Sequence, residues 1–317
     1  MRRASTPLRD DDIAECLRIL RKGSKSFAAA GRLLPSRLVG PVAAIYAFCR
    51  TSDDAIDDGG TASSLKRLAA SLDRVYANEP ADDVVERAFS SVVHAYRIPR
   101  QIPDALLEGY AWDLEGKRYA SFSELVEYCV RVASTVGLMM TLTMGERRPR
   151  VLARACELGV AMQLTNIARD VGEDARGGRI YLPLSWLEKA ALSPLDFVRQ
   201  PTASFEVRAM TRRLLRRAES FYESAEPGIA YLPADCRTAI FAARKIYAEI
   251  GRVIEANDYD SISTRAQTST GKKVELLATS LPSRIFAPKK DISARPLPEC
   301  AFLVESVSRT EEFVAWT

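Results

Sequence analysis

Two acidic clusters more than a hundred residues apart share one spacing. Both lie in patterns typical of helices, and residues four apart on a helix are surface neighbours. Like charges at this spacing oppose helix formation, so each cluster needs a neutralising partner. The first row pairs Asp53 with Asp57 and Asp54 with Asp58; the second contains Asn166, Asp170 and Asp174, with Gln163 beside it.

The oxygen atoms of these side chains predict a site for hard divalent cations. Mg²⁺ usually binds through one or two carboxylates plus substrate phosphates, and Mn²⁺ is the alternative ion. Two such rows facing each other across a cavity would hold a diphosphate through bridging metal ions. The predicted chemistry is therefore ionisation of an allylic diphosphate ester. Its candidate diphosphate contacts are Lys25, Arg50, Gln163 and Arg169.

Each cluster also has an ordinary structural explanation. An acidic helix end is most often a solvated cap. Arg50 has Asp53 and Asp54 within helical reach, and Arg169 has Glu173. Two clusters with basic and amide neighbours, both set into interior-type helices, favour the metal site.

The elements that must position these side chains are nearly all helical. Apolar residues recur at intervals of three and four, Gly and Pro fall between the segments, and no alternating strand has a hairpin partner. The segments around the clusters are apolar almost all round, which is typical of the centre of a bundle. We therefore predict an all-α, single-domain bundle around a central cavity, with helices at 13–20, 39–56, 65–76, 84–96, 105–114, 125–144, 151–171, 207–222 and 234–254.

The totals exclude several classes of protein. The chain has 317 residues, 47% hydrophobic and 27% charged, which is the balance of a soluble globular protein. A net charge of +4 is too small for a nucleic-acid partner. Six scattered cysteines predict reduced thiols, and the N-terminus has no apolar segment typical of a secretory signal. We expect a cytoplasmic protein with no bilayer-spanning run.

Two regions differ from this general pattern. Arg208, Arg212 and Arg216 form a basic stripe, which predicts either a solvated helix face or contact with an anionic membrane surface. Residues 1–280 form the predicted domain. Residues 281–317 contain four prolines and read as a loosely packed tail with a short helix at 302–307.

The motifs at these positions resemble the squalene/phytoene synthase family of head-to-head prenyl transferases. The resemblance covers roughly residues 23–273. Its main stretches are Gly-Ser-Lys-Ser-Phe at 23–27, Tyr46 leading into Cys-Arg-Thr-Ser-Asp-Asp at 49–54, Tyr-Cys at 128–129, Gln-Leu-Thr-Asn-Ile-Ala-Arg-Asp at 163–170 and Gly-Arg-Ile-Tyr-Leu-Pro at 178–183.

The resemblance implies an isoprenoid synthase fold with the two Asp-rich helices facing a central cavity. It implies one Mg²⁺ site at Asp53, Asp54 and Asp57 and a second at Asn166, Asp170 and Asp174. Tyr46 and Tyr128 are implied near the reacting carbons, where the final proton is lost. The implied diphosphate contacts are Ser24, Lys25, Arg50, Gln163, Arg169, Tyr247 and Arg265.

Within the family, the segments around Asp113, Val136 and Gln163 look most like bacterial members that form phytoene. The implied substrate is geranylgeranyl diphosphate, joined in pairs through a cyclopropylcarbinyl diphosphate, without a nicotinamide. Product release would involve peripheral contact with the inner membrane face. One departure is Gly23, where some relatives that make the thirty-carbon product carry His.

Two alternatives remain open at this point. One is a thirty-carbon synthase that makes presqualene diphosphate, squalene or dehydrosqualene from farnesyl diphosphate. The choice depends on cavity depth, for which Ala43, Ala47, Val136 and Met139 are the candidate residues. The other is a non-catalytic helical assembly factor, which would be expected to lose acidic ligands that are all present here.

Overall fold

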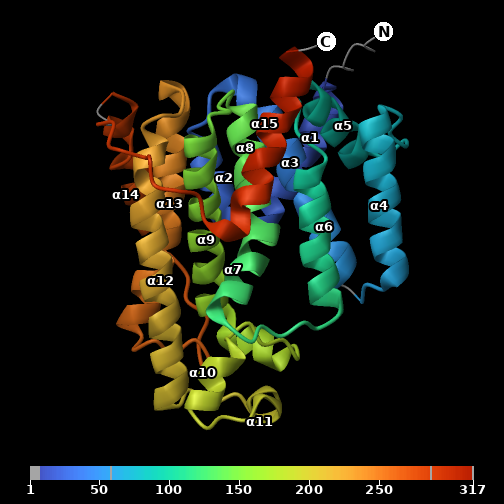
Figure 1. Ribbon diagram of the computed structural model, residues 1–317. Coiled ribbons are helices and arrows are strands. Elements are labelled where there is room, and N and C mark those ends of the chain that lie inside the picture. Colours follow the sequence, from blue (N-terminus) through green and yellow to red (C-terminus); the bar gives the residue numbers. More distant parts are fainter. Residues whose placement is uncertain (1–7, 58, 286–287, 316–317) are drawn as a thin grey trace.

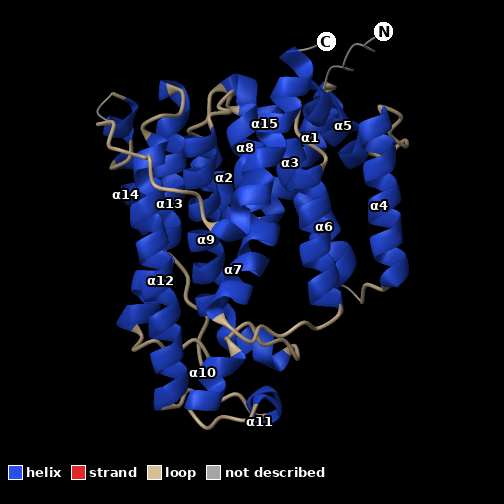
Figure 2. Cartoon of the chain, in the orientation of Figure 1, coloured by secondary structure: helices blue, strands red, loops and turns tan. Residues whose placement is uncertain are grey.

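The computed structural model describes residues 8–57, 59–285 and 288–315. Within these ranges every regular element is helical and no β-strand occurs, which confirms the predicted fold class (Figure 2). Asp58 of the first cluster lies outside the described residues. The helices of the first half are α1 (Asp10–Gly23), α2 (Lys25–Gly31), α3 (Ser36–Asp57), α4 (Ala62–Ala77), α5 (Val84–Ala95), α6 (Gln101–Leu114) and α7 (Phe122–Cys129).

Three short segments lie between the helices from α7 onward. A π-helical segment, η1 (Val130–Ser134), joins α7 to α8, and a 3₁₀ turn, η2 (Leu281–Arg284), follows α14. A second 3₁₀ turn, η3 (Pro298–Cys300), leads into the last helix. The helices are α8 (Thr135–Thr143), α9 (Pro149–Arg176), α10 (Leu184–Lys189), α11 (Pro194–Arg199), α12 (Phe205–Ile229), α13 (Ala234–Ala256), α14 (Thr270–Ala278) and α15 (Ala301–Ala315).

Helix α9 is the central element of the bundle. It packs along α12 and also contacts α8, α13, η1 and α15 (Figure 1). Gly159 permits the close approach to η1, because a Cβ atom there would lie 2.7 Å from the Cα atom of Ser134. Helix α3 packs against α1, α5 and α8 on the other side of the molecule. The two helices that carry the acidic clusters are therefore both held from several sides.

The helical run from Phe122 to Thr143 is long and apolar enough to cross a membrane. In the structure 67% of its most apolar window is buried among neighbouring helices. Leu138, Met139 and Leu142 are essentially inaccessible to solvent. The run is thus accounted for as a core helix, since a helix that is apolar all round belongs inside a bundle.

The C-terminal region is packed more closely than the sequence predicted. Helix α15 begins at Ala301 and extends well beyond the predicted 302–307. Its residues Leu303 and Val307 are fully buried, as is Cys300 in η3. Helix α15 contacts α6 and α9. The four prolines between positions 282 and 298 suggested a loose tail. The apolar face that packs against α6 and α9 belongs to α15, which begins after the last of these prolines. Where the domain ends stays a prediction.

Candidate active site

A cavity of about 1160 Å³ runs through the bundle. Its wall includes residues of α2, α3, α6, α7, α8, α9, α12, α13, α14 and η1, and of the loops that follow α9 and precede α14. One end is lined by charged side chains and the other mainly by apolar ones. A large pocket of this composition suits a long apolar ligand with an ionic head group.

The first acidic cluster ends α3 at the charged end of the cavity. Asp53 and Asp57 line the cavity, as their spacing predicted. Asp54 does not; its carboxylate pairs with Arg50, and Nε of Arg50 lies 3.2 Å from Oδ2 of Asp54. Arg50 lies farther from Asp53, at 3.6 Å between Nη1 and Oδ2. The structure thus pairs Asp54 with Arg50 outside the cavity wall, and its role as a metal ligand stays a prediction.

The second cluster lies on α9, and Asn166, Asp170 and Asp174 all line the cavity. Asp170 accepts two hydrogen bonds from Arg169, at 2.8 and 2.5 Å, and two from Arg265, at 2.7 and 3.2 Å. Burial opposes the charged form of Asp170, but these guanidinium groups lower the pKa of its carboxyl. Asn166 donates from Nδ2 to Oε1 of Gln163 at 3.4 Å.

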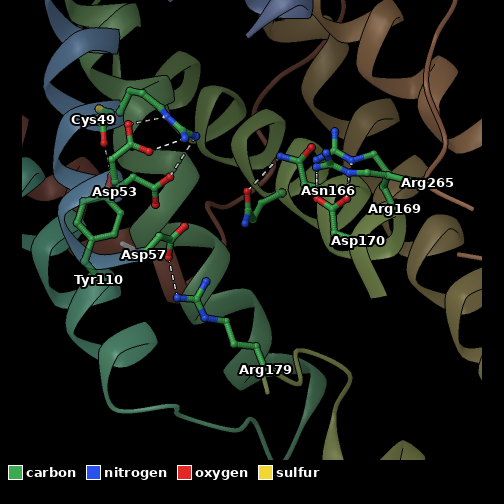
Figure 3. Close-up of polar contacts among 12 residues, drawn as sticks. Cys49, Asp53, Asp57, Tyr110, Asn166, Arg169, Asp170, Arg179 and Arg265 are labelled. Atoms are coloured by element: carbon green, nitrogen blue, oxygen red, sulfur yellow. Dashed lines mark hydrogen bonds and ion pairs between the residues drawn. The ribbon is translucent and has the colours of Figure 1, made fainter. Parts of the chain in front are cut away.

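The two clusters face each other across the cavity (Figure 3). Asp53 and Asp57 lie on one side, and Asn166 and Asp170 lie on the other. Arg179 reaches from the loop after α9 to the α3 row, where its Nη2 donates to Oδ1 of Asp57 at 2.6 Å. The sequence motif around Arg179 did not identify it as a site residue, because its partner is 122 positions away.

Two carboxyls of the site titrate far above their ordinary range. Burial, together with Asp57, raises the pKa of Asp53 to about 7. Burial, together with Asp170, raises the pKa of Asp174 to about 8. Crowded and partly desolvated carboxylates are the donors that a bound cation stabilises.

The arrangement fits Mg²⁺ better than a metal held by protein alone. Among the residues that the structure describes, no three His, Cys, Asp or Glu side chains converge on one point. Mg²⁺ demands few protein ligands, since waters and substrate phosphates complete its octahedron. The carboxylate rows therefore suit a cation that arrives with a diphosphate.

The predicted diphosphate contacts surround these rows. All seven of them line the cavity: Ser24, Lys25, Arg50, Gln163, Arg169, Tyr247 and Arg265. Ser24 also caps the N-terminus of α2, where its Oγ accepts from the backbone N–H of Phe27 at 3.1 Å. Lys273 on α14 lines the same end; burial and then the charge of Lys25 lower its pKa. The site thus gathers the positive charge that a diphosphate requires.

Comparisons with known proteins agree with this geometry. A family model described as squalene/phytoene synthase matches residues 20–272. The chain belongs to this family. It is 47% identical over 313 residues to a phytoene synthase of Cereibacter sphaeroides, covering 94% of this chain and 88% of the relative. It is 44% identical over 305 residues to a phytoene synthase of Rhodobacter capsulatus, covering 94% and 90%.

Solved structures give the same fold. A dehydrosqualene synthase crystallised with a ligand aligns with a TM-score of 0.80 at 34% identity, over 86% of this chain and 95% of the other. A squalene synthase from Alicyclobacillus acidocaldarius aligns with a TM-score of 0.72 over 80% and 97%; at 24% identity it supports the fold alone. The all-α isoprenoid synthase architecture predicted from the sequence is confirmed.

A buried polar network adjoins the carboxylates of this squalene/phytoene synthase family member. Tyr128 donates to Oδ2 of Asp113 at 2.8 Å, and Tyr181 donates to Oδ1 at 2.6 Å. All three residues line the cavity. Burial raises the pKa of Asp113 and of both phenols, so the phenols are neutral at physiological pH. Only Tyr128 of the three was predicted as a site residue.

Tyr46, the other predicted tyrosine, lies beside Gly23 at the cavity wall. A Cβ atom at Gly23 would come within 2.4 Å of the Tyr46 hydroxyl. Burial raises the pKa of Tyr46 to about 12. A His at position 23, as in some relatives, would therefore require Tyr46 to move.

The prediction of which residues set the depth of the cavity was wrong for three of the four. Val136 lines the cavity, but Ala43, Ala47 and Met139 are fully buried in the core and are not part of its wall. Helices α3 and α8 are apolar all round, so periodicity did not distinguish the face toward the cavity from the face toward the core. The apolar wall includes instead Phe27, Leu34, Val42, Met140, Met144, Leu158, Met162 and Ile240.

Proposed function

We propose that this family member joins two molecules of geranylgeranyl diphosphate head to head to form phytoene, releasing two diphosphates and two protons. The reaction passes through a cyclopropylcarbinyl diphosphate and serves carotenoid biosynthesis. One observation carries the proposal: two opposed carboxylate rows close one end of a cavity that is otherwise mainly apolar. Relatives named phytoene synthase at 44% and 47% identity support the choice of substrate.

Each cluster has a defined task in this reaction. Mg²⁺ would be held by Asp53 and Asp57 on one side and by Asn166, Asp170 and Asp174 on the other. When bound, it neutralises the charge of the diphosphate and so makes it a better leaving group. Arg residues suit the phosphate oxygens as bidentate donors, and Lys suits them as a point charge. In this role we place Arg50, Arg169, Arg179, Arg265, Lys25 and Lys273.

The remaining wall controls the carbocation that ionisation leaves behind. A cavity with an apolar interior excludes water, which would otherwise capture the cation as an alcohol. Tyr46 and Tyr128 line this cavity, and aromatic rings stabilise positive charge close to them. Both phenols are neutral, so a departing diphosphate oxygen beside them is the stronger base for the final proton.

The decisive experiment offers purified protein and Mg²⁺ either farnesyl or geranylgeranyl diphosphate and identifies the extracted hydrocarbon. We expect phytoene from the longer ester. Turnover of the shorter ester alone would overturn the proposal in favour of a thirty-carbon synthase. NADPH should not change the product, and a chelator should stop the reaction. A reduced thirty-carbon hydrocarbon that appears only with NADPH would indicate a squalene synthase.

The thirty-carbon alternative has one supporting observation, the similarity to a dehydrosqualene synthase at 34% identity. The relatives named phytoene synthase are more similar over a larger share of the chain. An assembly factor without activity is disfavoured, because the cavity retains both carboxylate rows.

We place the enzyme in the cytoplasm, in peripheral contact with the inner membrane face, because its substrate and product are lipids. Part of the basic stripe has partners within the protein. Arg208 pairs with Asp258 and Asp260, at 2.7 and 3.2 Å. Phe205 at the start of α12 is 81% exposed and suits a lipid surface. Flotation with anionic vesicles tests this contact; equal recovery with neutral vesicles would contradict an electrostatic attraction.

A further inference from the structure

A buried ion pair lies at the end of the cavity opposite the carboxylates. Arg154 and Glu157 on α9 are each 4% exposed at their side chains, and Nη2 of Arg154 lies 2.7 Å from Oε1 of Glu157. Arg154 also lines the cavity, together with Val151 and Ala155. A charged pair in an apolar wall is costly, and nothing in the proposed chemistry uses it.

The position of Arg154 along α9 places it near the far end of the cavity, with only Val151 of the α9 wall farther from Asp170. Sixteen residues separate it from Asp170, which corresponds to about 24 Å at the rise of an α-helix. A prenyl chain whose diphosphate lies at Asp170 extends along this wall toward Arg154. The stem of Arg154 is therefore placed to meet the end of the chain.

Helix α12 and the segment that precedes η3 prevent this side chain from moving aside. Helix α12 presses on its stem, because a Cβ atom at Gly228 would lie 2.4 Å from the Cβ atom of Arg154. Nη1 donates to Oγ of Ser224 at 3.2 Å. Nη2 donates to the backbone carbonyls of Ala294 and Arg295, each at 3.4 Å.

The last two contacts come from the segment between η2 and η3, residues 288–297. Tyr231 fixes this segment at a second point, where its hydroxyl donates to the carbonyl of Lys290 at 2.8 Å. Ile292 is buried in the core between these points. The segment predicted to be a loose tail thus supports the guanidinium that Arg154 presents.

We infer that Arg154, held by Glu157 and by residues 288–297, is the stop that limits the length of the prenyl chain. The stop is the aliphatic stem of Arg154, and the ion pair and the carbonyls fix its position. This inference rests on the proposed function, since it names the residue that fits the site to a chain of twenty carbons.

The test compares prenyl diphosphates of fifteen, twenty and twenty-five carbons by kcat/KM. Arg154→Ala/Glu157→Ala removes the stop without leaving an unpaired charge. We expect kcat/KM for the twenty-five-carbon substrate, divided by kcat/KM for the twenty-carbon substrate, to rise by about tenfold or more. An effect of this size is usual when space is added to an apolar pocket. The control, Arg154→Met/Glu157→Leu, keeps a long stem and should keep the wild-type ratio.

A second variant does not depend on the folding of the first. Ala155→Leu fills the same end of the cavity and should shift preference from twenty to fifteen carbons by about tenfold. Ratios within twofold of wild type in folded Arg154→Ala/Glu157→Ala or in Ala155→Leu would overturn the inference. Wild-type turnover of the fifteen-carbon ester alone would instead overturn the proposed substrate, so the two failures are distinguishable.

Discussion

The two carboxylate rows share one spacing but are neutralised differently. On α9, Asp170 is held by Arg169 from its own helix and by Arg265 from the loop before α14. On α3, Asp57 is held by Arg179, which comes from the loop after α9. The other wall carboxylate of each row, Asp174 on α9 and Asp53 on α3, has a raised pKa, and Arg50 lies 3.6 Å from Asp53.

The difference lies in where the pairing Arg originates. Asp170 is paired from its own side of the cavity, whereas Asp57 is paired by a residue from the opposite side, although Arg50 on α3 also pairs with Asp54. The Arg179–Asp57 contact therefore joins the loop after α9 to α3, while the Arg265–Asp170 contact joins the loop before α14, which carries a proposed diphosphate contact, to α9. A bound cation should stabilise the charged form most at Asp53 and Asp174, the carboxyls with raised pKa values.

The largest predicted effect is a loss of activity when a carboxylate of the cavity wall is replaced, compared with replacement of Asp54 outside the wall. Asp53→Asn and Asp170→Asn should each lower kcat/KM with geranylgeranyl diphosphate by roughly 10²–10³-fold, because each removes charge stabilisation from the leaving group. Asp54→Asn is the matched control on the same helix. Asp54→Asn should lower kcat/KM by less than about tenfold, since it breaks only a partly exposed ion pair with Arg50.

Steady-state assays of phytoene formation measure all three variants, with circular dichroism to check folding. A loss at Asp54 as large as the loss at Asp53 would show that Asp54 is a ligand after all. Such a result would restore the prediction made from the sequence.

The next effect tests the contact that joins the rows. Arg179→Gln should lower kcat/KM roughly 10–100-fold, as is usual for a residue that orients metal ligands. Arg179→Lys should recover part of the loss. Lys189→Gln, at an exposed position of α10, controls for the change in net charge. Equal activity of Arg179→Gln and the control would remove Arg179 from the site.

A smaller effect concerns the competition of protons with Mg²⁺. With pKa values of about 7 and about 8, Asp53 and Asp174 become protonated as the pH falls. Mg²⁺ requires the deprotonated carboxylates, so its binding weakens at low pH. Between pH 8 and pH 6 the Mg²⁺ concentration for half-maximal activity should rise by about tenfold or more.

Assays at fixed substrate concentration measure this change. The affinity of Mg²⁺ for the free substrate, determined separately at each pH, corrects for titration of the diphosphate itself. A corrected half-maximal concentration that is the same at pH 6 and pH 8 would contradict the raised pKa values.

The smallest predicted effect concerns stability without metal. Because the folded-state pKa values of Asp53 and Asp174 exceed the ordinary 3.8, the folded protein binds more protons than the unfolded one between about pH 4 and pH 8. These two groups therefore lower stability as the pH rises through that window. In EDTA at pH 8.5, Asp53→Asn and Asp174→Asn should each raise Tm by roughly 2–4 °C.

Differential scanning calorimetry measures this gain, and it should vanish at pH 4.5, where both carboxyls are already neutral in the wild type. An equal gain at both pH values would point to a cause other than charge.

Local spacing predicted the helices and both carboxylate rows because each depends on residues within a turn or two of one another. It missed Arg179, whose reach depends on the turn at Gly178, with φ of +83°. It also missed Asp113, which has its phenol partners 15 and 68 residues away. Contacts between distant segments leave no trace in the periodicity of either segment.

The cavity wall was predicted less well than its charged end. A carboxylate placed in an apolar helix identifies its own face, whereas an apolar residue in an apolar helix does not. Ala43 and Val42 are neighbours, yet only Val42 lines the cavity. The role of Arg154 was not predicted either, because it depends on α12 and on residues 288–297 as well as on α9.

The central claim is that both rows act on one diphosphate through Mg²⁺. Isothermal titration with an unreactive thio analogue of geranylgeranyl diphosphate, with and without Mg²⁺, tests it most directly in the wild type, Asp53→Asn and Asp170→Asn. We predict that Mg²⁺ tightens binding at least about tenfold in the wild type and that either substitution abolishes this gain. A Mg²⁺-dependent gain that persists in either variant would contradict the claim.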